Sequence, residues 1–253
     1  MKVTFLGTGT SQGVPIIACK CDVCVNNHPK NKRLRSSIQI EINDKIIVID
    51  SGPDFRQQML REATPDLHAL LFTHEHKDHI AGMDDIRGFN YVHQKPINIY
   101  CTKQVEQALR REYQYIFSDF KYPGIPEINL INIENKEFVV EGVKILPILV
   151  WHYKLPVFGF RINDFTYITD ANRIDDEELA KIMGSEILVL NALRRETHIS
   201  HFTLDEAIDI AQKIKAQKTY FTHISHQLGL HDEVNNELPE GIELAYDGLQ
   251  LNM

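Results

Sequence analysis

The segment 73–79 (Thr-His-Glu-His-Lys-Asp-His) places three histidines and an aspartate close together. Imidazole and carboxylate groups are ligands for Zn, Mn and Fe. The positions i, i+2, i+4 and i+5 do not share one face of a helix, so the spacing predicts a loop around metal. We expect His74 and His76 to face one ion, and Asp78 and His79 to face a second. A polar surface turn is the weaker alternative.

Three further candidate ligands follow apolar, strand-like segments elsewhere in the sequence. They are His152, Asp170 and His223. Each repeats the arrangement of the first segment, and rigid strand ends suit a metal site. Taken singly, each is equally compatible with an ordinary core or turn residue. Together with the first segment they form a set of seven, and a two-metal centre needs roughly seven to eight protein ligands, counting a bridging carboxylate.

Two aspartates have more specific expected roles. Asp170 is the best bridging candidate, because one carboxylate can hold two cations ~3.5–4 Å apart. Asp50 also ends a strand-like segment, before Ser51-Gly52. We expect it to orient a histidine or to cap loop amides rather than to bind metal itself.

Three of the four cysteines, Cys19, Cys21 and Cys24, lie within one short segment. Residues of a Cys-x-Cys pair are poorly placed to bridge one another, so a disulfide is disfavoured. Metal ligation is favoured over free thiols. Cys101 is expected to be a buried strand residue.

Composition narrows the class of protein. The chain has 253 residues, of which 43% are hydrophobic, enough for a full core. Because it has neither a leader-like N-terminus nor an apolar run of ~20 residues, we expect a cytoplasmic protein without membrane contact. The net charge of −8 argues against a large nucleic-acid surface. The glycine-rich segment 7–13 lacks the Gly-Lys-Ser/Thr of a phosphate-binding P-loop.

The hydrophobic pattern predicts more strands than helices. Strands are expected at 3–6, 37–42, 45–50, 69–72, 97–101, 143–150, 157–162, 165–169, 187–190, 218–222, 242–245 and 249–251. Helices are expected at 54–62, 103–117, 175–183 and 204–215, the last with a Thr203–Glu206 capping box. Two sheets packed together with helices outside would suit this pattern, but periodicity leaves the topology open.

The seven candidate ligands, together with Asp50, resemble the signature of the metallo-β-lactamase superfamily. The resemblance covers nearly the whole chain. It implies an α/β protein with an αββα sandwich and metals at one edge. It also implies a single domain, 1–253, with a zinc-knuckle loop near 19–24.

Finer motifs resemble the PhnP-type cyclic phosphate phosphodiesterases. These motifs are the segment 7–15, the cysteine cluster and the segment 222–227. The resemblance implies a structural zinc ion held by Cys19, Cys21, Cys24 and His226. It also implies that His201 donates a proton, although an ordinary residue before a helix is the alternative. His198 and His231 are expected on the surface.

The expected reaction is hydrolysis of a small phosphodiester, for instance a cyclic ribose phosphate. Two Zn or Mn ions would lower the pKa of water from ~15.7 toward ~7, giving hydroxide that attacks phosphorus. Asp78 would bind metal and anchor the nucleophile, and His201 would protonate the leaving oxygen. Arg35, Lys154 and Arg194 are candidates for holding a second phosphate, although each is more typical of a surface charge.

Four alternatives remain at this stage. A tRNA 3′-processing endonuclease has the same metal set but needs a basic arm, which the sequence lacks. A PqqB-like accessory protein also carries a cysteine zinc site. A thioesterase or lactamase fits the phosphodiesterase-like motifs less well. A non-catalytic metal-binding protein of the same fold would usually lack a ligand, and none is missing. A homodimer is possible for any of them.

Overall fold

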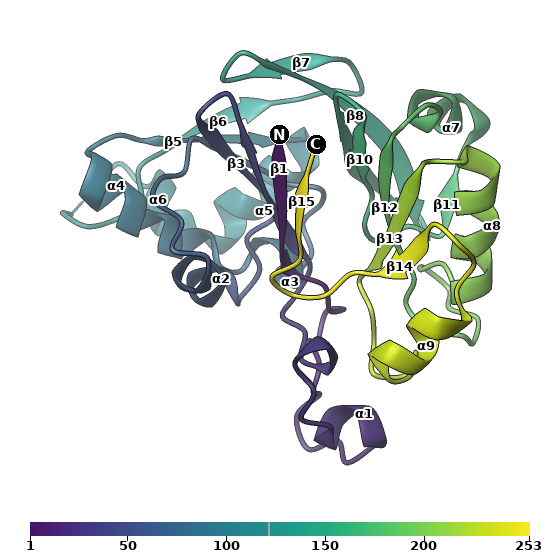
Figure 1. Cartoon of the computed structure of the whole chain (residues 1–253). Helices are drawn as coiled ribbons and strands as arrows, with labels where there is room; N and C mark the ends of the chain where they lie inside the picture. The colour runs from purple at the N-terminus through teal and green to yellow at the C-terminus, as the bar shows by residue number, and fades with distance from the viewer. Residues whose placement is uncertain (121) are drawn as a thin grey trace.

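The computed structural model describes residues 1–120 and 122–253, and these residues build two sheets packed face to face (Figure 1). In the described residues the first sheet has seven strands. Their order is β15 (Gln250–Asn252), β1 (Lys2–Gly7), β2 (Ser37–Ile42), β3 (Lys45–Ile49), β4 (Ala69–Leu71), β5 (Ile97–Cys101) and β6 (Ile128–Asn132). The strands β3 to β6 run parallel, whereas β15, β1, β2 and β3 pair antiparallel.

The second sheet has eight strands among the described residues. Their order is β11 (Arg173–Ile174), β8 (Val143–His152), β9 (Leu155–Ile162), β10 (Phe165–Tyr167), β12 (Ile187–Asn191), β13 (Lys218–Thr222) and β14 (Ile242–Leu244), with β7 (Phe138–Val140) paired to β8. The strands β10, β12, β13 and β14 are parallel. Parallel strands end at the same edge, so loops that follow them lie together.

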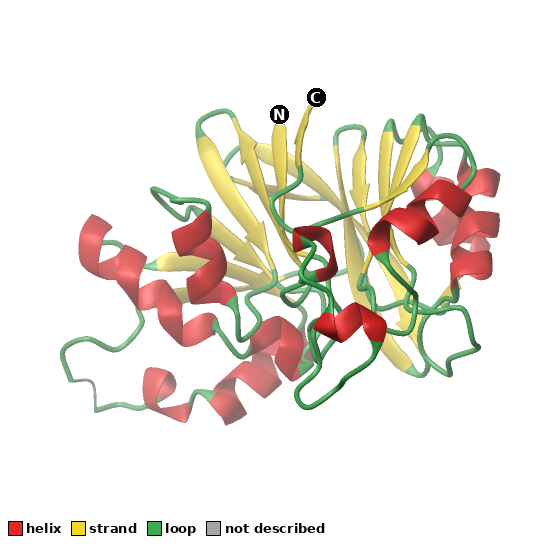
Figure 2. Cartoon of the chain, turned by 60° about the horizontal axis from the view of Figure 1, so that its bottom comes forward, coloured by secondary structure: helices red, strands yellow, loops and turns green. Residues whose placement is uncertain are grey.

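The helices cover the outer faces of both sheets (Figure 2). Those associated with the first sheet are α2 (Phe55–Arg61), α3 (Lys77–Ile80), η2 (Met83–Ile86), α4 (Arg87–His93), α5 (Lys103–Glu112) and α6 (Gln114–Phe117). Those on the second sheet are α7 (Asp176–Ile182), α8 (Leu204–Ile214) and α9 (His231–Glu237). The short α1 (Asp22–Val25) and η1 (Pro29–Asn31) lie in the N-terminal loop, and α1 projects away from the sheets (Figure 1).

Three hydrophobic clusters account for this layering. One fills the space between the sheets and includes Phe5 and Phe160. The other two lie beneath the helices, one around Phe72 and one around Phe221. Burial of apolar side chains on both faces of each sheet gives the α/β, αββα sandwich that the resemblance predicted, so the fold class is confirmed.

Local sequence signals explain several elements. Asn43 and Asp44 both adopt a positive φ, as a two-residue turn between β2 and β3 requires. The predicted capping box forms, since Thr203 Oγ1 accepts from the amide of Glu206 and the Glu206 carboxylate accepts from the amide of Thr203. Cys101 is buried in β5, as predicted.

Other boundaries differ from the predictions. The expected helix 103–117 is interrupted at Tyr113, whose φ of −120° is not helical and whose hydroxyl donates to the carbonyl of Ile80. The strand β8 continues through His152. The short strands β6, β7 and β11 and the helices α4 and α9 were not predicted.

The two chain ends are neighbours. The strands β1 and β15 pair antiparallel, and the amino group of Met1 donates to the carbonyl of Met253 at 2.7 Å. Both ends lie at the side of the sheets opposite α3 (Figure 1). No helix in the described part of the chain is long and apolar enough to cross a membrane.

Candidate metal centre

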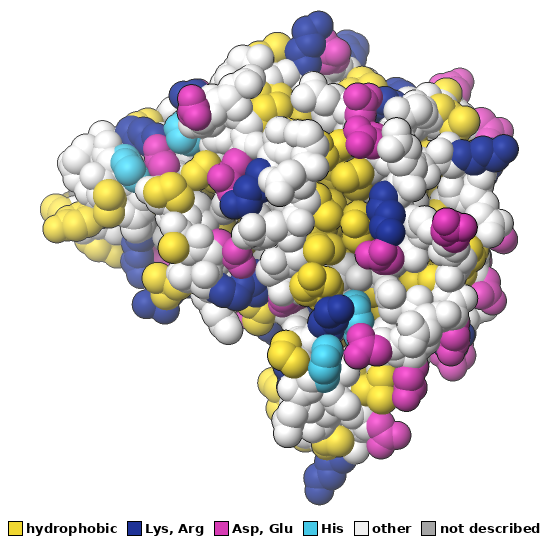
Figure 3. Space-filling view, viewed as in Figure 1, with side chains coloured by type: hydrophobic (Ala, Val, Ile, Leu, Met, Phe, Trp, Pro, Cys, Tyr) yellow, Lys and Arg dark blue, Asp and Glu magenta, His cyan; other side chains and the backbone are white. Residues whose placement is uncertain are grey.

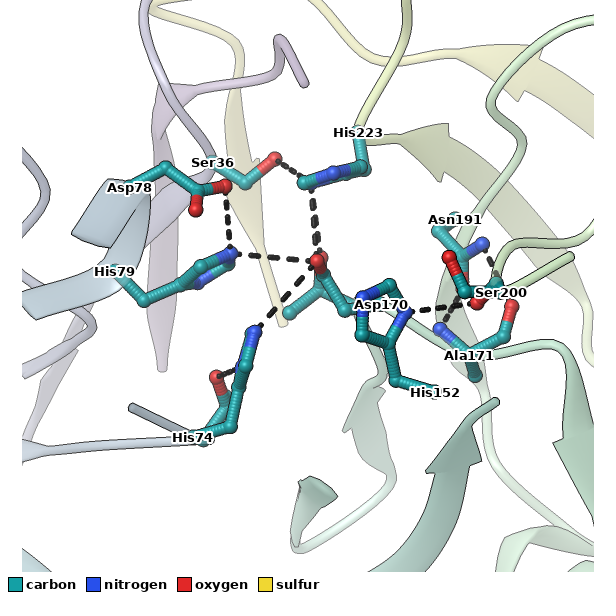
Figure 4. A network of polar contacts seen from close by, with 12 residues as sticks. Ser36, His74, Asp78, His79, His152, Asp170, Ala171, Asn191, Ser200 and His223 are labelled. Atoms are coloured by element: carbon teal, nitrogen blue, oxygen red, sulfur yellow. Dashed lines mark hydrogen bonds and ion pairs between the residues drawn. The ribbon is translucent and has the colours of Figure 1, made fainter. Parts of the chain in front are cut away.

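The seven predicted ligands come together at the edge of the sandwich where several strands end. Figure 4 labels all of them except His76. His74, His76, Asp78 and His79 follow β4, and His152 is the last residue of β8. Asp170 follows β10, and His223 follows β13. We refer to these seven residues as the His/Asp cluster: His74, His76, Asp78, His79, His152, Asp170 and His223.

The prediction that the whole segment 73–79 is a loop was wrong in one part. His74 and His76 lie in a loop, but Asp78 and His79 lie in the single helical turn α3. The amide of Ile80 donates to the carbonyl of His76, which starts the turn directly after the second histidine. The change from extended backbone to helix therefore separates the two pairs of side chains.

Three residues of the site adopt left-handed backbone conformations. The φ angles are 65° at Asp50, 52° at Asp170 and 57° at His223. Such values are uncommon for residues other than glycine and concentrate at functional sites. Each occurs directly after a strand or within a few residues of its end, where it turns the chain sharply.

Asp170 lies between two groups of donor atoms. Its Oδ2 is 3.7 Å from His74 Nε2, and its Oδ1 is 3.4 Å from His79 Nε2 and 3.0 Å from His223 Nδ1. One group comprises His74, His76 and Asp170, and the other Asp78, His79, Asp170 and His223. This division is the one predicted from the spacing, with Asp170 common to both.

Two buried nitrogens show that the cluster suits cations. His74 Nε2 and His79 Nε2 are buried and make no hydrogen bond among the described residues. Buried polar atoms are normally paired, and these nitrogens face the carboxylates of Asp78 and Asp170. Imidazole nitrogen and carboxylate oxygen are the donors that Zn and Mn take in proteins, so the residues present fit divalent metal.

Asp50 holds two of these histidines in orientation. Its Oδ2 accepts from His79 Nδ1 at 2.7 Å, and its carboxylate also accepts from the amide and the hydroxyl of Thr73. The same hydroxyl contacts His74 Nδ1 at 2.9 Å. With their Nδ1 atoms engaged, both histidines present Nε2 to the cluster, which is the orienting arrangement expected for Asp50.

Buried charges set the protonation of the cluster. Burial lowers the pKa of His74 well below its ordinary value, and the neighbouring His79 lowers it further. Burial also opposes ionisation of Asp170, but His223 and His79 hold its pKa well below the usual range. Asp170 is therefore an anion and His74 is neutral, and these are the forms that bind metal.

His201 lies beside the cluster, as the resemblance implied. Its ring centroid is 4.4 Å from that of His152 and 4.8 Å from that of His223. Burial lowers the pKa of His201 to about 2. His152 is fixed separately, since its Nδ1 donates to the carbonyl of Ser200 at 2.8 Å. Donor atoms of His152, Asp170 and His201 lie close enough together to hold a metal ion, a possibility that the sequence did not indicate.

The other predicted ligand set also assembles, and we refer to it as the Cys/His cluster: Cys19, Cys21, Cys24 and His226. His226 Nδ1 is 3.2 Å from the sulfur of Cys21 and 3.5 Å from that of Cys19. The contact with His226 lowers the pKa of Cys21 to about 6, whereas burial raises that of Cys24 to about 11. Three sulfurs and one nitrogen make a donor set that suits a closed zinc site.

The structure distinguishes the three cations proposed for a second phosphate. The guanidinium of Arg35 binds the Asp54 carboxylate and the Ser11 carbonyl. Arg194 donates to the carbonyls of Glu196 and Thr197 and to the side chain of Gln227. Lys154 has no hydrogen bond or ion pair within residues 1–120 and 122–253, and lies over the ring of Tyr153.

Of the two histidines expected on the surface, the prediction for His231 was wrong. His231 is buried, because its Nδ1 accepts from the buried guanidinium of Arg33 and its ring packs against Tyr246. His198 is half-buried, and its ring lies 5.1 Å from that of His201.

The family model of the β-lactamase superfamily domain matches residues 45–224. The chain belongs to this superfamily. The structure of a diphosphatase from the PhnP family superposes with a TM-score of 0.94 at 38% identity, covering 100% of this chain and 97% of that one. The Zn²⁺-bound PqqB of Methylobacterium extorquens superposes with a TM-score of 0.78 at 21% identity, covering 100% of both chains. At that identity PqqB shows the fold alone.

A longer relative carries a different name. A Porphyromonas gingivalis protein named octanoyltransferase is 37% identical over an alignment of 254 positions, which covers 99% of this chain and 51% of that protein. The chain thus spans about half the length of this curated relative. The name describes a protein about twice as long.

Proposed function

We propose that the protein is a metal-dependent hydrolase that cleaves a small phosphodiester or a related phosphoric ester bond. The observation that carries the proposal is the position of Asp170 between two sets of donor atoms, beside buried nitrogens of His74 and His79 that make no hydrogen bond among the described residues. The likeness to a PhnP-family diphosphatase over the whole chain supports phosphorus chemistry. It also makes a diphosphate bond one of the bonds to test.

The His/Asp cluster would hold two divalent cations, Zn or Mn, with Asp170 common to both. Bound there, the cations would activate water and offset the charge of the phosphoryl oxygens. The Cys/His cluster would hold one structural Zn. Asp78 would combine metal binding with positioning of the attacking water, and its pKa is held below the usual range by His79 although burial opposes this.

His201 is the residue we assign to the leaving oxygen. Its buried ring is neutral at rest, so it starts as a hydrogen-bond donor and not as an imidazolium. An anionic substrate bound beside it raises the pKa of the ring, which favours proton uptake in the complex. The proton then passes to the departing alkoxide.

The surface does not favour tRNA as a substrate. On the face shown in Figure 3, Lys and Arg side chains alternate with Asp and Glu and form no continuous basic band. The net charge of −8 has the same implication, since nucleic-acid affinity comes mainly from phosphate contacts. A small substrate is therefore preferred.

The proposal is tested by hydrolysis of bis(p-nitrophenyl) phosphate after reconstitution with Mn²⁺ or Zn²⁺. We expect turnover that requires metal and that is lost in His76→Ala, with the metal content of each protein measured in parallel. A panel of cyclic diesters, linear diesters and diphosphates then defines the bond. Turnover unaffected by chelation, or absent with two ions bound per His/Asp cluster, would refute the proposal.

A further inference from the structure

The helical turn α3 carries two residues of the His/Asp cluster but is too short to be stable by itself. It spans Lys77–Ile80, and Asp78 and His79 extend from it toward Asp170 (Figure 4). A single turn fixes several residues for very few hydrogen bonds, so it does not form readily alone. Contacts from outside α3 must therefore fix the position of both side chains.

One support for α3 is the loop that follows Asp50. The amide of Ser51 donates to the carbonyl of His79 at 2.8 Å. Gly52 leaves no room for a side chain between the loop and α3, because a Cβ on Gly52 would lie 2.0 Å from the carbonyl oxygen of Asp78. The backbone of α3 therefore packs directly against the backbone of this loop.

The second support is Tyr113, at the break between α5 and α6. Its hydroxyl donates to the carbonyl of Ile80, the last residue of α3, at 2.7 Å, and this bond is buried. The last carbonyls of a helix have no partner within the helix, so a buried one needs a donor from elsewhere. Tyr113 supplies that donor to Ile80.

The surroundings of Tyr113 suit it to this contact. Its ring packs in the apolar cluster around Phe72, which also includes Ile80 and Met83. Burial raises the pKa of Tyr113 to about 12. The hydroxyl therefore keeps its proton at neutral pH and remains a donor.

Other polar contacts join the α5–α6 segment (103–117) to the segment 75–84, and these lie at the surface. They are the pairs Gln104–Glu75, Lys77–Glu112 and Tyr115–Asp84. Exposed pairs of this kind contribute little, because solvent competes for both partners. The buried bond from Tyr113 is therefore the contact expected to fix α3 most strongly.

The two groups of donor atoms in the His/Asp cluster differ in their dependence on α3. We call the group of Asp78, His79, Asp170 and His223 the α3 group, and the group of His74, His76 and Asp170 the loop group. Two donors of the α3 group come from α3, whereas the loop group takes none from it. A shift of α3 would therefore change distances in the α3 group and leave the loop group largely in place.

We propose that Tyr113 is a positioning residue for the metal ion of the α3 group. By fixing the end of α3, its hydroxyl keeps the Asp78 carboxylate and His79 Nε2 directed at the point that the donors of this group share. Tyr113 acts through α3 and is not itself a ligand. The inference rests on the metal binding of the proposed function and adds a residue outside the His/Asp cluster.

The test is Tyr113→Phe, which keeps the ring in the apolar cluster and removes only the hydroxyl. The full chain is used, with zinc retained in the Cys/His cluster and the His/Asp cluster emptied by a mild chelator. Titration with Co²⁺, followed by visible absorption, then measures binding to the His/Asp cluster. We expect the affinity of the α3 group to fall about tenfold, and that of the loop group less than about twofold.

Two background variants assign the affected ion. In His76→Ala the loop group is disabled, and Tyr113→Phe should still weaken the remaining ion about tenfold. In Asp78→Ala the α3 group has already lost a ligand, so Tyr113→Phe should change the remaining ion less than about twofold. Equal weakening of both ions, or of neither, would overturn the inference.

Tyr115→Phe is the matched control, because it removes an exposed hydroxyl from the same segment. It is expected to leave both affinities unchanged. Circular dichroism and the zinc content of the Cys/His cluster check that each variant is folded. A Tyr113→Phe protein that does not fold would overturn the inference, since the hydroxyl would then support the whole domain and not one ion.

Hydrolysis supplies a second readout. At limiting Mn²⁺ the Tyr113→Phe protein should be less active than the parent chain, and about tenfold more Mn²⁺ should restore the parent kcat. A loss of kcat that persists at saturating Mn²⁺, with unchanged Co²⁺ affinity, would overturn the inference. Absence of hydrolysis in the metal-loaded parent chain would refute the proposed function, while the Co²⁺ titrations still decide the inference.

Discussion

The His/Asp cluster and the Cys/His cluster differ in how the fold supports them. His74, Asp170 and His223 are buried just beyond the ends of strands, and His79 is buried in the helical turn α3. The Cys/His cluster joins the projecting N-terminal loop to His226, and Cys21 is exposed. One set of donors is built into the sandwich, whereas the other attaches a loop to it.

The two clusters also differ in the types of donor atom that they contain. Nitrogen and oxygen donors that face a shared carboxylate leave positions for water and substrate, while three sulfurs and a nitrogen saturate a tetrahedral ion. His223 and His226 are three residues apart, yet they serve different clusters. The proposed division into a reactive and a structural metal site therefore depends on the donor set and its support, and not on distance along the chain.

The largest expected effect comes from Asp170→Asn. Removing the charge shared by both groups is expected to lower activity on the order of 10³-fold. Metal analysis should show loss of metal from the His/Asp cluster and retention of one ion in the Cys/His cluster. Asp164→Asn, in the exposed turn after β9, is the control. Full activity in Asp170→Asn would contradict the proposal that the His/Asp cluster, and not the Cys/His cluster, is the reactive site.

His201→Gln should lower kcat on the order of 10²-fold for an alkyl diester, because a poor leaving group needs a proton. The loss should be smaller for bis(p-nitrophenyl) phosphate, whose leaving group departs readily without one. Metal content is expected to stay unchanged. A loss of metal instead would make His201 a ligand, consistent with its closeness to His152 and Asp170.

Cys24→Ser tests whether the Cys/His cluster is a structural metal site. We expect one metal ion fewer per chain and a loss of about 4 kcal/mol in unfolding free energy at high zinc, since bound metal stabilises the folded state. Activity should fall less than about tenfold. Thermal unfolding, metal analysis and diester hydrolysis measure the three quantities. An activity loss as large as that of Asp170→Asn would show that the Cys/His cluster is not merely structural.

The smallest effect concerns the contact between Arg33, which follows the cysteines, and His231, which lies a few residues beyond His226. Burial, with the charge of Arg33, lowers the pKa of His231 to about 3 in the folded protein, below its ordinary value of 6.5. The unfolded chain therefore takes up this proton first, and stability is lost as pH falls from 6.5 toward 3.

His231→Asn keeps an acceptor for Arg33 and removes the titration. Between pH 6.5 and pH 4 we expect the variant to lose about 1–3 kcal/mol less stability than the parent chain, a range reduced for partial solvation of the ring. Urea unfolding at several pH values measures the difference. His28→Asn, at an exposed histidine, should follow the parent chain.

The sequence predicted the donors better than their geometry. Histidines and aspartates that follow apolar, strand-like segments can be recognised in the sequence as candidate ligands. The family resemblance predicted the αββα sandwich, whose topology the hydrophobic periodicity left open. By contrast, φ is positive at Asp50 and Asp170, and no glycine or asparagine at these positions signals it in the sequence. The burial of His231 likewise depends on Arg33, which is 198 positions away in sequence.

The pairing of β1 with β15 also has a consequence for engineering. Because Met1 and Met253 meet at the side of the sandwich away from α3, a short linker could join them, and new ends could be opened in a surface turn such as Asn43-Asp44. The same arrangement lets the protein be tethered to a solid support, or fused to another enzyme, by either end with its reactive edge facing outward.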